Sequence, residues 1–110
     1  MNVSYITSAA KPQQFPAESL PEIAFIGRSN SGKSTLLNTL TGHNRIARTS
    51  RTPGRTQMAN FFSCNNRCLL VDLPGYGFAH GAANSMRPMW EKLVTGYLQR
   101  QTIFKIVFLM

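Results

Sequence analysis

One stretch in the first third of the chain has the residue types and spacing of a phosphate-binding loop. Residues 27–34 read GRSNSGKS and fit the pattern G-x-x-x-x-G-K-[ST]. Glycines let the backbone curl so that its N–H groups face phosphate oxygens, and a helix N-terminus favours the same anion. The lysine would bridge the outer two phosphates, and the last hydroxyl would coordinate Mg²⁺. We therefore predict a nucleotide-phosphate site made of Gly27, Arg28, Ser29, Asn30, Ser31, Gly32, Lys33 and Ser34.

A second candidate, Asp72-Leu73-Pro74-Gly75, comes directly after the hydrophobic run at residues 69–71. A carboxylate at the end of a buried strand can hold a magnesium-bound water. The N–H of the closing glycine can bond a γ-phosphate and release it after hydrolysis. Alone, D-x-x-G is also explained by a plain turn. Because the motif follows a phosphate loop by one helix and one hairpin, it predicts the γ-phosphate side of a nucleotide switch.

Residues 42–58 lie between these motifs and have no apolar periodicity. A long irregular stretch of this kind in a compact domain is usually functional. A switch loop needs one hydroxyl that reaches Mg²⁺, and spacing does not choose among Thr49, Thr52 and Thr56. The stretch also carries four arginines, which fit either a solvated loop or contact with RNA phosphates: Arg45, Arg48, Arg51 and Arg55.

The elements that must position these motifs follow from hydrophobic patterning. We predict a buried strand over 23–26, a helix over 33–40 stopped by Gly42, and two strands over 58–64 and 67–71 joined by Asn65-Asn66. A helix then begins near Asn84 or Ser85, with Pro88 in its first turn. Its apolar face would comprise Met89, Trp90, Leu93, Val94, Tyr97 and Leu98, as core side chains, and a strand would follow over 103–110.

This order predicts an α/β fold of the P-loop NTPase type, similar to small GTPases. It would have three layers and a mostly parallel sheet with one antiparallel edge hairpin. Residues 1–20 contain Pro12 and Pro16 and are interpreted as an extended N-terminal arm, and residues 21–110 as the domain itself.

Composition narrows the class of protein. The chain has 110 residues, enough for one domain, and carries a formal net charge of +8. Phosphates of a nucleotide need only a cation or two, so the excess predicts a polyanionic partner such as RNA or a ribonucleoprotein. A basic protein without such a partner is the alternative.

Cys64 and Cys68 do not have the spacing of a metal site and are expected to be free thiols. The sequence shows no signal peptide or membrane span, so we expect a cytoplasmic protein. We also expect it to be a monomer.

Three segments resemble one family closely. They are PEIAFIGRSNSGKSTLLNTL, ARTSRTPGRTQMANFF and LLVDLPGYGFA, which are similar to the EngB (YihA/YsxC) family of Era-like bacterial GTPases. The similarity runs from about Pro21 to Met110, and TPGRTQ and DLPGYG are its most specific motifs. The resemblance implies a protein that binds GTP and GDP with Mg²⁺. It also implies a role in cell division, septation and assembly of the large ribosomal subunit, with that subunit or its RNA as partner.

The same resemblance assigns roles in the irregular stretch. It makes Gly54-Arg55-Thr56-Gln57-Met58 the switch motif, with Thr56 and Ser34 as magnesium ligands and Asp72 acting through water. Asn30 resembles its counterpart in potassium-assisted GTPases, which raises K⁺ as a second ion; the alternative is that it only stabilises the loop. Tyr76 stands where many GTPases have a water-orienting glutamine, so no catalytic residue is assigned.

The sequence departs from the family at its C-terminal end. The family's guanine-reading T-K-x-D motif does not occur, so we expect an N-terminal piece of the domain, incomplete at the C-terminus. GTPase activity of such a piece would be weak or absent. Two other functions stay open: a non-enzymatic RNA- or ribosome-binding module, and an ATP-using P-loop protein, against which the TPGRTQ motif argues.

Overall fold

The computed structural model describes residues 3–17, 20–27, 32–42, 58–75, 87–100 and 105–109. Its centre is a five-stranded sheet with the strand order β1-β3-β4-β2-β5. The strands are β1 (Val3–Ala9), β2 (Glu22–Ile26), β3 (Ala59–Cys64), β4 (Cys68–Asp72) and β5 (Lys105–Leu109). The helices described are α1 (Lys33–Thr41), α3 (Arg87–Leu98) and a short 3₁₀ turn, η1 (Pro12–Gln14). None of the helices described is long and apolar enough to cross a membrane.

The sheet is mixed. Strand β2 lies between β4 and β5 and runs parallel to both, whereas β3 is antiparallel to β4 and to β1. Parallel strands are covered on both faces, which is why β2 reads EIAFI, with little alternation of polar and apolar residues. The predicted α/β fold with a parallel centre and an antiparallel hairpin is confirmed.

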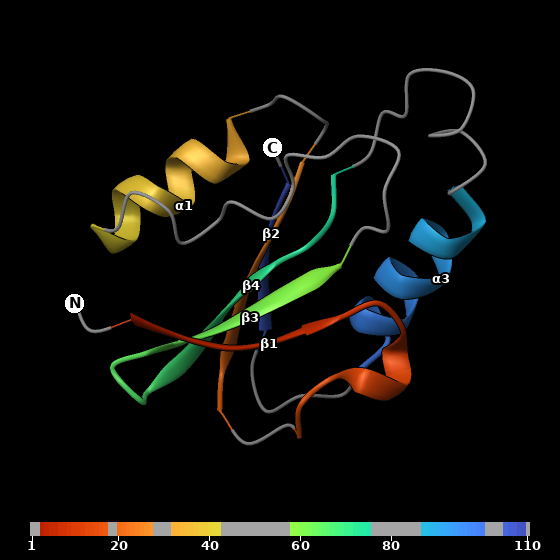
Figure 1. Cartoon of the computed structure of the whole chain (residues 1–110), viewed down its shortest axis with the longest axis horizontal. Helices are drawn as coiled ribbons and strands as arrows, with labels where there is room; N and C mark the ends of the chain where they lie inside the picture. The colour runs from red at the N-terminus through yellow and green to blue at the C-terminus, as the bar shows by residue number, and fades with distance from the viewer. Residues whose placement is uncertain are drawn as a thin grey trace.

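Side chains alternate between two hydrophobic clusters, one on each face of the sheet. One cluster combines strand residues such as Ala24 and Phe61 with Leu93 and Tyr97 of α3. The other combines their neighbours in the strands with Leu37 of α1. The two helices therefore cover opposite faces, and Figure 1 shows the sheet between them. This arrangement is the predicted three-layer architecture.

The predicted hairpin forms, but it does not lie at the edge of the sheet. Asn65 and Asn66 both have positive φ, 55° and 56°, which asparagine tolerates and tight hairpin turns require. The free edge of β3 is covered by β1, which pairs with it over its whole length. Within residues 1–20, interpreted from the sequence as an extended arm, Val3–Ala9 is thus an edge strand of the sheet.

Both helices form where the sequence predicts them, but the apolar face of α3 is only partly buried. Gly32 and Gly42 bracket α1 with φ of 89° and 74°, and the Gly42 N–H bonds to carbonyls of the last turn, which ends the helix. Tyr97 of α3 is fully buried, as expected for a core residue. Met89 and Leu98 were expected on the same apolar face but are exposed, because the stripe that contacts the sheet is narrower than predicted.

A buried polar cluster joins the N-terminal segment to the end of α3. Glu22 is fully buried at the start of β2, and its Oε1 accepts a 2.8 Å hydrogen bond from the Tyr97 hydroxyl. Arg100 lies 3.5 Å from the same oxygen, donates to the Pro16 carbonyl at 2.7 Å and stacks on the Phe15 ring. This cluster lies at the amino ends of the parallel strands, whereas Asp72 lies at their carboxyl ends.

Tyr97→Phe should therefore lower stability without touching the site described next. The change removes a buried hydrogen bond to a carboxylate, which we expect to lower the free energy of unfolding by about 2 kcal/mol. Urea unfolding would measure it. Tyr5→Phe is the matched control, because the Tyr5 side chain is exposed and its loss of a hydroxyl should cost far less. Equal effects of the two substitutions would contradict the prediction.

Candidate nucleotide-phosphate site

The two sequence motifs meet at one edge of the sheet. Strand β2 ends at Ile26 and leads into the phosphate-loop segment, after which α1 begins at Lys33. Strand β4 runs parallel to β2, pairs Asp72 with Phe25, and ends there. Ligands of open α/β sheets bind outside the carboxyl ends of the parallel strands. The register therefore brings the two predicted motifs to the edge where such a site is expected.

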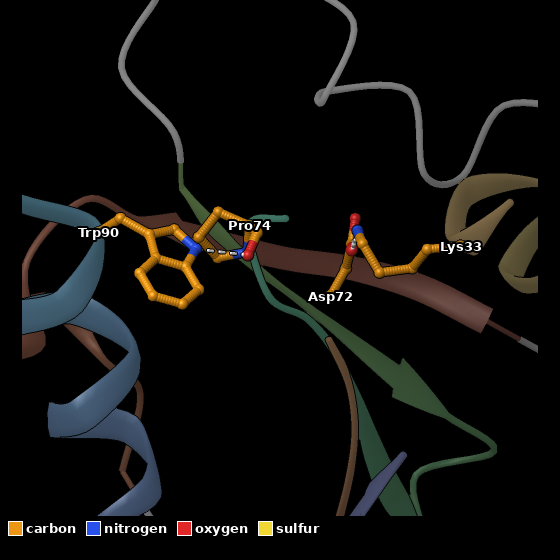
Figure 2. A network of polar contacts seen from close by, with 4 residues as sticks. All are labelled: Lys33, Asp72, Pro74 and Trp90. Carbon is orange, nitrogen blue, oxygen red and sulfur yellow. Dashed lines mark hydrogen bonds and ion pairs between the residues drawn. The ribbon is translucent and has the colours of Figure 1, made fainter. Parts of the chain in front are cut away.

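An ion pair joins the two motifs directly. The Lys33 ammonium group contacts Oδ1 of Asp72, and both side chains are buried, with 7% and 1% of their surface exposed. Figure 2 shows the two side chains extending toward each other from α1 and β4. The phosphate-loop motif contains no carboxylate, so the ammonium group of Lys33 pairs with Asp72 of the second motif.

The Asp72 carboxylate has spare capacity for a ligand. Burial raises the pKa of this carboxyl above its ordinary value, and Lys33 and a hydrogen bond from Asn60 act in the opposite direction with smaller effect. Its second oxygen, Oδ2, is buried and has no hydrogen-bond partner among the described residues. Carboxylate oxygens are ligands that Mg²⁺ and its bound waters prefer. This orphaned oxygen therefore fits the magnesium-side role expected of Asp72.

The raised pKa gives stability a defined dependence on pH in the absence of nucleotide and metal. The folded pKa lies above the ordinary 3.8, so folding is favoured by the protonated form. That contribution is complete below pH 3.8 and is lost as pH rises through the folded pKa. Against Asp72→Asn, the wild-type chain should lose stability as pH rises, by at most about 1.4 kcal/mol per pH unit.

Urea unfolding of both proteins between pH 4 and 7 would measure this difference. Glu91→Gln is the control, because this carboxylate is 56% exposed and pairs with Arg87 on the surface of α3. A wild-type chain that gains stability over Asp72→Asn with rising pH would mean that the Lys33 ion pair outweighs the cost of burial.

The segment after Asp72 is anchored on both sides. The Leu73 side chain is fully buried, and its N–H donates to the Phe25 carbonyl at 3.0 Å. The Pro74 carbonyl accepts a 2.8 Å hydrogen bond from the indole N–H of Trp90, which is drawn in Figure 2. Gly75 is half-buried at the end of this segment. The predicted γ-phosphate segment is thus tied to β2 and to α3.

Other predicted site residues are only partly described. Gly27 is buried directly after β2, Gly32 precedes α1, Ser34 is the second residue of that helix, and Met58 is 42% exposed before β3. The following predictions fall outside the described residues: Arg28, Ser29, Asn30, Ser31, the arginine-rich stretch with Thr49 and Thr52, Gly54, Arg55, Thr56, Gln57 and Tyr76.

Sequence reasoning missed one residue of the site. Asn60 is 3% exposed and lies opposite Asp72 on the neighbouring strand, where its side chain acts to lower the pKa of that carboxyl. The signal was present, since Asn60 is the one strongly polar side chain in the otherwise apolar strand segment MANFF. A buried amide in such a strand needs partners, which points to a polar site.

Comparison with known proteins shows the family of the chain. A family model described as 50S ribosome-binding GTPase matches residues 22–108, most of the chain. The chain belongs to the 50S ribosome-binding GTPase family. The matched region includes both motifs and all of the strands except β1.

Several curated relatives are about 50% identical to the chain over the matched residues. The chain is 49% identical over 104 residues to the probable GTP-binding protein EngB of Solibacter usitatus, covering 94% of this chain and 54% of that protein. It is 54% identical over 101 residues to the probable GTP-binding protein EngB of Coxiella burnetii, covering 92% and 49%. The expected resemblance to EngB is confirmed. The chain spans about half the length of the curated relatives it matches.

Proposed function

We propose that this chain binds GTP and GDP through the phosphates, as the nucleotide-holding part of a GTPase switch. The observation that carries the proposal is the buried contact between Lys33 and Asp72, which brings the two motifs together at the carboxyl end of the parallel strands. The family match and the names of the curated relatives support guanine nucleotides as the ligand.

In this proposal Lys33 changes partners when the nucleotide arrives. The β- and γ-phosphates offer the ammonium group several negative oxygens, whereas Asp72 offers one charge whose burial is already unfavourable. Lys33 then neutralises phosphate charge and Asp72 becomes available to a magnesium-bound water. The backbone of residues 27–34 donates N–H groups to the phosphates, and residues 54–58 and 72–75 report whether a γ-phosphate is present.

Mg²⁺, when bound, would neutralise phosphate charge, and this chain would hold it by the hydroxyls of Ser34 and Thr56 and, through water, by Asp72. The orphaned Oδ2 of Asp72 supports this assignment. K⁺ near Asn30 belongs to the proposal as a second, weaker ion requirement. Replacing K⁺ with Na⁺ in the binding buffer tests that part separately.

The proposed cellular role is assembly of the large ribosomal subunit, together with normal cell division and septation. The description of the matched family and the formal net charge of +8 support a ribosomal partner, because RNA phosphates attract such a surface. We propose that the protein acts in the cytoplasm as a monomer, and that its arginine-rich stretch contacts ribosomal RNA.

Titration of fluorescent GDP, GTP and ATP, each with and without Mg²⁺, tests the proposal. We expect GTP and GDP to bind more tightly than ATP, and to bind more tightly with Mg²⁺ than without it. Equal affinity for ATP would support the alternative of a P-loop protein whose base selection is not encoded in these residues. Absence of any nucleotide binding, combined with RNA binding that weakens as salt rises, would favour the non-enzymatic RNA-binding module instead.

A further inference from the structure

A row of three polar residues crosses the sheet and ends at the candidate site. Ser8 on β1 lies opposite Asn60 on β3, and Asn60 lies opposite Asp72 on β4. Residues directly opposite each other in antiparallel strands share a face of the sheet and bring their side chains together. The face is the one that α1 covers, because Phe62 and Leu70, two positions along the same strands, pack with Leu37 of α1. We call Ser8, Asn60 and Asp72 the polar row.

The contacts along the polar row have a defined direction. The Ser8 hydroxyl donates a 2.6 Å hydrogen bond to Oδ1 of Asn60. That bond occupies the acceptor end of the amide, so the NH₂ end is the one that can donate to the Asp72 carboxylate, which lies directly opposite on the neighbouring strand. Ser8 already uses its proton, so the Tyr5 hydroxyl, 2.6 Å from Ser8 Oγ, is the donor in that outer contact. Each member therefore fixes the orientation of the next.

An irregularity in β1 brings Ser8 into the row. The register of β1 with β3 shifts between Tyr5 and Thr7, which leaves Ile6 as an extra residue in the strand. Without that bulge, Thr7 would lie opposite Asn60 and Ser8 would turn to the other face. Bulges often re-aim a side chain next to a functional site. The bulge therefore places Ser8, and not Thr7, opposite the amide.

The polar row would orient Asp72 once a nucleotide is bound at the site. In the proposed function Lys33 leaves Asp72 for the phosphates, and the carboxylate then needs another group to hold its direction. The Asn60 amide lies opposite it on the neighbouring strand and is 3% exposed, so water has little access to the amide. Residues that hydrogen-bond to a metal-side ligand set its orientation, and their loss typically weakens metal affinity.

We propose that Asn60, oriented by Ser8, is a positioning residue that aims the Asp72 carboxylate at the magnesium-bound water. This inference rests on the proposed binding of Mg²⁺ with GTP. It extends the site to the N-terminal strand, which carries no phosphate-binding motif. It also gives the buried amide of Asn60 a role beyond filling the space between β1 and β4.

The test is the Mg²⁺ concentration that half-saturates GTP binding, measured with the whole 110-residue chain and fluorescent GTP. Asn60→Leu keeps the shape of the side chain and removes both ends of the amide, and should raise that concentration by roughly 10-fold or more. Ser8→Ala leaves the amide in place but frees its orientation, and should raise it by about 3-fold. Affinity for GTP without Mg²⁺ should stay close to that of the wild type in both variants.

Two control variants separate positioning from packing. Ser63→Ala removes a hydroxyl from the same strand as Asn60, one that donates a 3.2 Å hydrogen bond to the exposed hairpin residue Asn66. Phe62→Leu disturbs the same buried face two residues away. Both should leave the Mg²⁺ requirement unchanged, although Phe62→Leu should lower the melting temperature.

The outcomes distinguish the inference from the function on which it rests. An unchanged Mg²⁺ requirement in Asn60→Leu, with wild-type GTP binding intact, would overturn the inference alone. A shift as large in Phe62→Leu would overturn it too, because loosened packing would then be the cause. Failure of the wild-type chain to bind GTP with Mg²⁺ would overturn the proposed function and the inference with it.

Discussion

Lys33→Ala is expected to weaken GTP binding by about 100-fold or more. The substitution removes the buried cation that faces the carboxyl ends of β2 and β4, where the phosphates would lie. Hydrogen bonds to charged groups are worth about 1.5–3 kcal/mol each, and the ammonium group would make at least two of them to the outer phosphates. About 3 kcal/mol of lost binding energy corresponds to the expected factor. Titration with fluorescent GTP and GDP in Mg²⁺ measures it.

The same substitution has a second effect that complicates the comparison. It leaves Asp72, which is 1% exposed, without its cation, and breaking a buried pair on one side typically destabilises by about 3–5 kcal/mol. Because burial raises the pKa of this carboxyl, its protonation would relieve part of that cost. Weak binding by Lys33→Ala could therefore reflect partial unfolding.

A double substitution separates the two effects. Lys33→Met with Asp72→Asn removes both charges at once, so no unpaired charge is left buried and stability should return toward that of the wild type. GTP binding should not return, because the phosphates still lack their cation. Recovery of binding together with stability would show that Lys33 matters only for folding. Circular dichroism and the nucleotide titration, on the same samples, give the two readouts.

The parts of the site that could be predicted are those that local sequence determines. Gly32, directly before Lys33, has a left-handed backbone conformation, with φ 89°, where a side chain would be strained. Hydrophobic runs located β2 and β4, and the turn chemistry of Asn65-Asn66 located the hairpin between β3 and β4. Once β2 and β4 are parallel, the meeting of the two motifs follows from the geometry of the sheet.

The parts that could not be predicted depend on pairing between distant segments. Ser8 and Asn60 are 52 positions apart, and they meet only because β1 adds to the edge of β3 with a bulge at Ile6. Pro12 and Pro16 led to the interpretation of residues 1–20 as an extended arm, and nothing local shows which register a strand will adopt. For the same reason Asn60 stood out as a polar residue in an apolar strand without revealing that it faces Asp72.

The contribution of Asp72 itself gives the second large expected effect. Asp72→Asn should leave GTP binding without Mg²⁺ near that of the wild type and should raise the Mg²⁺ requirement by about 10- to 100-fold. Asparagine has the same shape but carries no negative charge, so it holds a metal-bound water weakly. Glu91→Gln removes one carboxylate from the exposed face of α3 and should change neither quantity. An unchanged Mg²⁺ requirement in Asp72→Asn would exclude this carboxylate from the metal side of the site.

Combining Asp72→Asn with Asn60→Leu then tests how the two residues are related. If Asn60 acts through Asp72, its removal has little left to affect once the carboxylate is gone. The double variant should need about as much Mg²⁺ as Asp72→Asn alone, whereas independent sites would multiply their effects. Multiplied effects would mean that Asn60 reaches the metal or the nucleotide by another route. The cycle therefore distinguishes a residue that orients the carboxylate from one that contributes to the site on its own.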